Sequence, residues 1–96
     1  MPQQLETEVK ILNKLGLHAR PAAMLVKTTN EFKCDIYLKK GDMEVNAKSI
    51  LGVMMLAAEQ GSVLRISASG EDAEPAMQAV VDLFANKFGE DEQEVE

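Results

Sequence analysis

The sequence LETEVKILNKLGLHARPAAMLVKTTN, residues 5–30, changes from a strand-like to a helix-like spacing of apolar side chains. Residues 5–11 alternate between apolar and charged side chains, which is typical of a half-buried strand. The apolar positions within residues 19–30 follow helical spacing. Pro21 must lie in the first turn of that helix, because only there does its missing N–H have no intrahelical partner. The helix is therefore predicted to begin at His18 or Ala19.

The rest of the chain repeats the same two patterns. The further predicted strands are residues 34–39, 43–47 and 63–69, and the further predicted helices are residues 50–58 and 72–87. With the first strand and helix, the order is βαββαβα. The simplest packing is an α+β open-faced sandwich, in which a four-stranded, mostly antiparallel sheet carries three helices on one face.

Length and charge predict one domain with an acidic end. The 96 residues fit a single domain, which we place at residues 1–88. Five of the 16 acidic residues lie in the last seven positions, so the net charge of −6 belongs mainly to residues 89–96. We expect this acidic tail to be disordered.

Composition argues against several other functions. Nucleic-acid binding is disfavoured, because acidic residues outnumber basic ones by 16 to 10 and that binding depends on neutralising phosphates. With one cysteine and one histidine, the chain has no zinc-ligand spacing, and we expect neither a metal nor a cofactor. The strongly apolar run at residues 50–58 is too short to cross a bilayer, and the N-terminus has no signal-peptide pattern. We expect a cytoplasmic monomer without membrane insertion.

His18 is the most informative residue, because it lies where the predicted strand leads into the helix. A helix N-terminus carries free N–H groups and a partial positive charge, so it binds anions. The amides of Ala19 and Arg20 are available there, and the Arg20 guanidinium adds paired donors for phosphoryl oxygens. The dipole also disfavours imidazolium, which predicts a neutral, nucleophilic ring. Gly16 and Pro21 shape the helix start, and we interpret Gly16 as leaving room for a partner.

Each of these features also has a purely structural interpretation. His18 could simply cap the helix. The adjacent arginine and proline make a nucleophilic role only as probable as this capping role. Ser49 is favoured as the N-cap of the next helix, although a phosphate there would add negative charge where an acidic partner docks. This short helix has more apolar residues than one buried face requires, among them Ile50, Leu51 and Met54. These residues are either part of the core or an exposed docking site.

Three segments resemble the HPr family, the histidine-containing phosphocarriers of the bacterial phosphotransferase system. GLHARPAA, at residues 16–23, resembles the phosphorylation signature of the family. AKSILGVM, at residues 47–54, resembles its regulatory-serine segment, and ISASGED, at residues 66–72, resembles its last strand-to-helix join. The resemblance extends over residues 5–88 and implies the same four-stranded, three-helix sandwich.

The resemblance also implies roles for individual residues. His18 matches the residue phosphorylated on Nδ1, Arg20 matches the active-site arginine, and Ser49 matches a serine that a dedicated kinase or phosphorylase modifies in some bacteria. The donor would be phosphorylated enzyme I and the acceptors enzyme IIA-type proteins, so the chain would be a phosphoryl carrier and not an enzyme. The predicted docking surface consists of apolar residues: Leu17, Ile50, Leu51 and Met54.

Two alternative functions are considered in addition to phosphoryl carriage. One is a regulatory interaction module that is switched by phosphorylation of Ser49 or His18. The other is a plain α+β ligand-binding domain with a capping histidine, in which His18→Ala would leave function intact. The residues Lys14 and Leu15 before Gly16 resemble sequences from a regulatory branch of the family. The pathway can therefore be either sugar uptake or nitrogen-related regulation.

Overall fold

The structure, a computed structural model, describes residues 3–90. Residues 91–96, which make up most of the predicted acidic tail, lie outside the described residues. The elements are β1 (Gln3–Lys10), α1 (Ala19–Thr29), β2 (Asp35–Lys40), β3 (Met43–Asn46), α2 (Ile50–Met55), β4 (Val63–Gly70), α3 (Ala73–Ala85) and the 3-10 turn η1 (Lys87–Gly89).

The strands form one four-stranded sheet in the order β1-β4-β2-β3, and each neighbouring pair is antiparallel. β2 and β3 are joined by a short turn and form a hairpin. β4 lies between β1 and β2, with Ile66 opposite Thr7 on one side and opposite Leu38 on the other. The predicted α+β open-faced sandwich is therefore confirmed.

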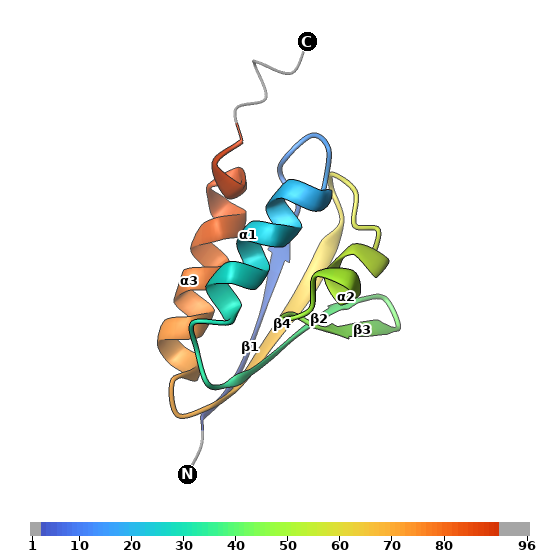
Figure 1. Cartoon of the computed structure of the whole chain (residues 1–96). Helices are drawn as coiled ribbons and strands as arrows, with labels where there is room; N and C mark the ends of the chain where they lie inside the picture. Colours follow the sequence, from blue (N-terminus) through green and yellow to red (C-terminus); the bar gives the residue numbers. More distant parts are fainter. Residues whose placement is uncertain (1–2, 91–96) are drawn as a thin grey trace.

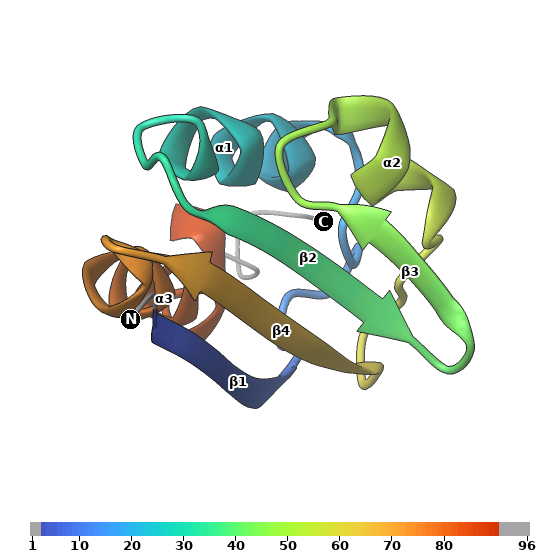
Figure 2. The same cartoon turned by 90° about the horizontal axis from the view of Figure 1, so that it is seen from below.

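The three helices lie on one face of this sheet (Figures 1 and 2). α3 packs against β1 and β4, and α2 packs beside β3. The period-two pattern of β4 explains the two faces: Leu64, Ile66 and Ala68 are buried beneath the helices, whereas Arg65 lies on the opposite, open face. The start of α1 and the turn η1 lie at the same end of the molecule (Figure 1).

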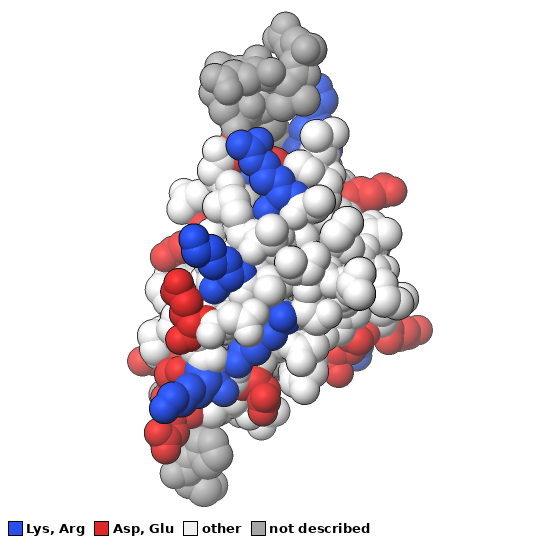
Figure 3. Space-filling view, in the orientation of Figure 1, with Lys and Arg blue, Asp and Glu red and all other residues white. Residues whose placement is uncertain are grey.

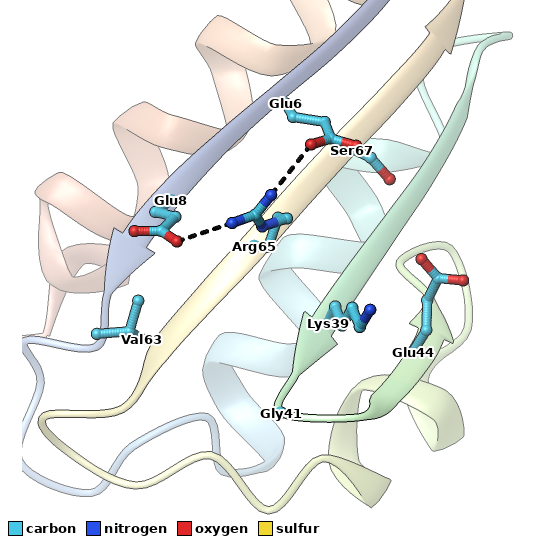
Figure 4. Close-up of a pocket in the computed structure, with 8 residues that line it drawn as sticks. All are labelled: Glu6, Glu8, Lys39, Gly41, Glu44, Val63, Arg65 and Ser67. Atoms are coloured by element: carbon cyan, nitrogen blue, oxygen red, sulfur yellow. Dashed lines mark hydrogen bonds and ion pairs between the residues drawn. The ribbon is translucent and has the colours of Figure 1, made fainter.

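The open face of the sheet carries a shallow hollow lined largely by charged side chains (Figure 4). Arg65 forms ion pairs there with Glu6, at 3.3 Å, and with Glu8, at 3.1 Å. Exposed pairs of this kind contribute at most about 1 kcal/mol each. None of the predicted functional residues lines this hollow.

Two helices end earlier than the sequence pattern predicts. α2 ends at Met55, because Ala57 adopts a φ of 49° and the Lys40 ammonium donates to the carbonyls of Leu56 and Ala57. α3 ends at Ala85, and η1 follows it. Within residues 3–90, no helix combines the length and apolar character needed to cross a membrane.

Asp72 joins the start of α3 to the segment before β2. Its side chain makes no capping bond within α3. The carboxylate instead accepts hydrogen bonds from the backbone N–H groups of Lys33, at 2.8 Å, and Cys34, at 2.9 Å. The Lys33 amide foremost, and the Cys34 bonds after it, hold the pKa of Asp72 below its ordinary value of 3.8.

Asp72 should therefore stabilise the fold in a pH-dependent way. A carboxyl group with a lowered folded-state pKa contributes fully above its ordinary pKa, and the contribution is lost as the pH falls through the folded-state value. We expect Asp72→Asn to lower the free energy of unfolding near neutral pH, and the gap to wild type to close in acid. Chemical denaturation across this pH range measures the gap. Asp42→Asn, in the exposed β2–β3 turn, is the control, and an equal gap for both variants would contradict this account.

Candidate functional site

His18 occupies the N-cap position of α1. Its backbone is extended, with φ −73° and ψ −172°, and its carbonyl accepts the first helical bond from Ala22 at 3.0 Å. The imidazole makes no capping hydrogen bond to the helix. The side chain is 34% exposed, so it is within reach of a partner. The capping interpretation thus describes the backbone of His18 and leaves its ring without a capping role.

Gly16 sets the path of the chain into this position. It adopts a φ of +68°, and a Cβ atom there would lie 2.3 Å from the carbonyl oxygen of Ala58. That same carbonyl accepts a hydrogen bond from the Leu17 amide at 2.9 Å. The space beside Gly16 is thus filled by the loop after α2. This corrects the interpretation that Gly16 leaves room for a partner.

Ala19 and Arg20 open α1 directly after His18. Helix geometry leaves their amides without intrahelical acceptors, and Pro21 in the third position has no N–H to satisfy. Both residues are exposed, whereas Pro21 is buried. Within residues 3–90 the Arg20 guanidinium forms no ion pair, so it is available to an anion beside His18. The predicted group is therefore brought together at one helix end.

Glu90 and Asn13 join this group, although the sequence analysis did not select them. The Oε2 atom of Glu90 lies 2.7 Å from Nε2 of His18. Asn13, only 1% exposed, donates from Nδ2 to Oε1 of Glu90 at 2.9 Å and to the Gly16 carbonyl at 2.8 Å. Glu90 was assigned to the acidic tail, residues 89–96, which was expected to be disordered. The available signal was Phe88, an apolar residue just after the predicted third helix, which is buried and anchors the segment before Glu90.

Ser49 is the N-cap of α2, and its Oγ accepts a hydrogen bond from the Gly52 amide at 3.1 Å. The favoured capping interpretation is therefore confirmed. The segment before Ser49 is fixed to α1, because the Thr29 hydroxyl donates to the Ala47 carbonyl at 2.8 Å. Phosphorylation of Ser49 stays a prediction.

The apolar residues of α2 are mostly exposed. Leu51 is 76% exposed, and Ile50, Met54 and Met55 are exposed as well, whereas Val53 is buried. Figure 3 shows a wide uncharged area over the helical side of the molecule, with Lys and Arg side chains distributed on the same side. Most of this helix therefore does not belong to the core, and its role as a docking site stays a prediction.

Leu17 requires a correction. It was predicted to belong to the docking surface, but it is only 4% exposed and packs in the core. The Leu17 amide is bonded to the Ala58 carbonyl, which turns the side chain of Leu17 inward. Leu15, at 59% exposed, is the most exposed apolar residue of this loop, and Leu12 is exposed to a smaller extent.

Cys34 does not belong to the site. Burial foremost, and then the hydrogen bond to Asp72, raises the pKa of its thiol to about 11. A buried thiol that stays protonated at neutral pH is a poor nucleophile. Cys34 is thus a free, buried cysteine with a structural role.

Comparison with known proteins gives a consistent result. The family model PTS-HPr, described as the PTS HPr component phosphorylation site, matches residues 5–86. The phosphocarrier protein HPr of Xylella fastidiosa is 54% identical over 87 residues, which cover 91% of this chain and 98% of that protein. The crystal structure of HPr-C-His from Thermoanaerobacter tengcongensis has a TM-score of 0.88 at 49% identity, covering 91% of this chain and 98% of that one. A structure described as an HPr dimer from the same organism has a TM-score of 0.74 at 51% identity, covering 85% and 94%.

Proposed function

The chain belongs to the HPr family of phosphotransferase-system phosphocarriers, and from this premise we propose that His18 accepts a phosphoryl group from phosphorylated enzyme I and passes it to enzyme IIA-type proteins. The observation that supports this proposal best is the position of the ring. The half-exposed imidazole of His18 stands at the N-terminus of α1 and takes no part in capping. Arg20 follows two positions later, and within residues 3–90 its guanidinium forms no ion pair. We infer a carrier that is loaded and unloaded, and not an enzyme that turns over a substrate.

The helix start supplies what a transferred phosphoryl group needs. The amides of Ala19 and Arg20 and the positive end of the α1 dipole stabilise the oxygens that carry negative charge. The Arg20 guanidinium can bind two of these oxygens at once. The phosphoryl group must move onto His18 and off it again readily, so the site should hold the group only moderately tightly. An exposed arginine in place of a buried cluster of cations fits that requirement.

The exposed apolar residues of α2 form the proposed docking surface for both partners, with Leu15 in place of Leu17. Met side chains suit a surface that meets more than one protein, because they adapt their shape at little cost. A carrier must also leave its partner quickly, which favours a small interface of about 1,200 Å² or less. We keep the monomer as the proposed working state, since a dimer that covered α2 would hide this surface.

A relay assay tests the proposed function. Labelled phosphoenolpyruvate, enzyme I, this chain and an enzyme IIA-type protein are mixed, and the label on each protein is followed with time. We expect label to reach the IIA-type protein only when this chain is present. Label that stays on this chain through several additions of folded IIA-type acceptors would contradict carriage and favour the regulatory module.

The regulatory module is kept as a second function because Ser49 caps the helix that exposes Ile50 and Leu51. A phosphate on Ser49 would suit the N-terminus of α2 and would not unfold it. It would place negative charge beside the docking surface. We therefore propose that Ser49 phosphorylation, where a kinase is present, weakens the docking of an acidic partner.

Ser49→Asp imitates this charge. Aspartate ranks with serine as an N-cap, so the bond from the Gly52 amide is retained and the melting temperature should stay close to wild type. We expect weaker binding to enzyme I in isothermal titration calorimetry, because like charges meet at the interface. Gln4→Glu adds the same charge on the open sheet face and should leave binding unchanged. Wild-type affinity for Ser49→Asp would exclude charge repulsion as the mechanism.

A further inference from the structure

Glu90 is the acidic side chain that touches His18 within residues 3–90. Its Oε2 atom lies 2.7 Å from Nε2 of His18, and its Oε1 atom accepts from Nδ2 of Asn13 at 2.9 Å. The Glu90 side chain is only 13% exposed, so the contact is largely shielded from water. With both oxygens bound, the carboxylate has a fixed orientation relative to the ring.

The core of the protein holds Glu90 in this place. Phe88 is buried, and its ring packs edge-on against Phe84 with the centroids 4.9 Å apart. Lys87 and Phe88 adopt φ values of 55° and 53°, which non-glycine residues rarely accept. Such a conformation persists only where the surrounding structure determines it, and it concentrates at functional sites. The turn η1 thus brings Glu90 back across the start of α1.

The chemistry of this contact determines which ring nitrogen carries the proton. An ionised carboxylate only accepts hydrogen bonds, so Nε2 of His18 must be the donor. A neutral imidazole with its proton on Nε2 has its lone pair on Nδ1. We propose that Glu90 is a positioning residue for phosphoryl transfer, which keeps the proton on Nε2 and leaves Nδ1 free to attack phosphorus. This inference rests on the proposed function of His18.

The same contact supports the transfer step. The Nδ1 lone pair forms the new bond to phosphorus, and the bond between phosphorus and the donor atom breaks, with its electron pair leaving on the donor. The proton stays on Nε2, so the ring gains positive charge as the bond forms. The Glu90 carboxylate, 2.7 Å from Nε2, stabilises that charge. When the group passes to an acceptor, the ring returns to the same neutral tautomer.

Asn13 makes the inference sharply testable. Its Nδ2 atom donates both to Glu90 and to the Gly16 carbonyl, which fixes the orientation of the amide. In Glu90→Gln, the new side-chain carbonyl would accept from Asn13, and the NH₂ group would face Nε2 of His18. This group can only donate, so it would hold the proton on Nδ1 instead and block the nucleophile. Glu90→Gln should therefore be more harmful than Glu90→Ala, which merely removes the carboxylate.

The test combines ring-nitrogen NMR with transfer rates on the full chain. In ¹⁵N spectra at alkaline pH, we expect the Nε2–H tautomer in wild type, the distribution of free histidine in Glu90→Ala, and a shift towards Nδ1–H in Glu90→Gln. With phosphorylated enzyme I as donor, transfer should slow about 10-fold in Glu90→Ala, the effect of losing one charge-assisted hydrogen bond, and further in Glu90→Gln. Glu31→Gln, an exposed residue after α1, is the matched control and should change neither measurement.

The possible outcomes separate this inference from the proposed function. Unchanged tautomers with normal transfer in both variants would overturn the positioning role alone. Faster transfer in Glu90→Ala would also overturn it, because the carboxylate would then be competing with the phosphoryl group. If the tautomers shift as expected but wild type accepts no phosphoryl group, the tautomer assignment is supported and the proposed function is overturned.

Discussion

Arg20→Ala is expected to slow phosphoryl transfer to and from His18 about 10- to 100-fold while the domain stays folded. The guanidinium is exposed and forms no ion pair within residues 3–90, so its removal costs the fold little. Its proposed role is to bind phosphoryl oxygens through paired, charge-assisted hydrogen bonds, which are worth about 1.5–3 kcal/mol. Quenched-flow kinetics with phosphorylated enzyme I as donor measures the transfer rate. The melting temperature, measured in parallel, shows whether the domain stays folded.

Two further variants make the Arg20 experiment specific. Arg20→Lys keeps the charge but loses the two-pronged geometry, so its rate should fall between those of wild type and Arg20→Ala. Lys27→Ala removes an exposed cation from the last turn of the same helix and should leave the rate unchanged. Equal rates for Arg20→Ala and Lys27→Ala would remove Arg20 from the site.

Gly16→Ala is expected to destabilise the domain by about 3 kcal/mol or more, which is in the range of severe single substitutions. The new Cβ would lie 2.3 Å from the Ala58 carbonyl oxygen and 3.0 Å from the Glu59 Cα. These are backbone atoms, so a side-chain rotation cannot relieve the contact. The substitution should also disturb the bond from the Leu17 amide to Ala58 and, through it, the position of His18.

Gly41→Ala is the matched control for Gly16→Ala. Gly41 has a similar φ of +58°, but nothing lies within 4 Å of the position that its Cβ would occupy. It should therefore show only the backbone strain of a left-handed residue, about 1–2 kcal/mol. Urea denaturation measures the unfolding free energy of both variants. The difference between their losses is the effect of the contact with Ala58. Equal losses of unfolding free energy would show that this contact is unimportant.

The local pattern of the chain was enough to predict its elements and their buried faces. The strand predicted at residues 63–69 corresponds to β4, and its alternation puts Leu64 and Ile66 under the helices. Pro21 correctly fixed the start of α1, because proline is confined to the first turn of a helix. The sheet order β1-β4-β2-β3 was not predicted, since pairing between distant strands depends on contacts that no local period encodes.

The candidate site was predicted in part, and its gaps have physical causes. His18 and Arg20 stand out because their residue types and their place at a helix start carry a chemical meaning. Glu90 was missed because an acid in an acid-rich stretch resembles a solvated charge. Of the three consecutive positive φ values that bring it back, two fall on Lys87 and Phe88, where the sequence gives no glycine to signal a turn. Leu17 was misplaced because an apolar residue beside a site suits a core or a surface equally well.

The central claim is that His18 is the phosphoryl acceptor, and intact mass after incubation with phosphoenolpyruvate and a bacterial enzyme I tests it most directly. Wild type and His18→Ala are compared, with circular dichroism to show that both are folded. We predict one added phosphoryl group on wild type, lost in acid, and none on His18→Ala. A phosphoryl group on folded His18→Ala, or no transfer to folded wild type from several enzymes I, would contradict the account.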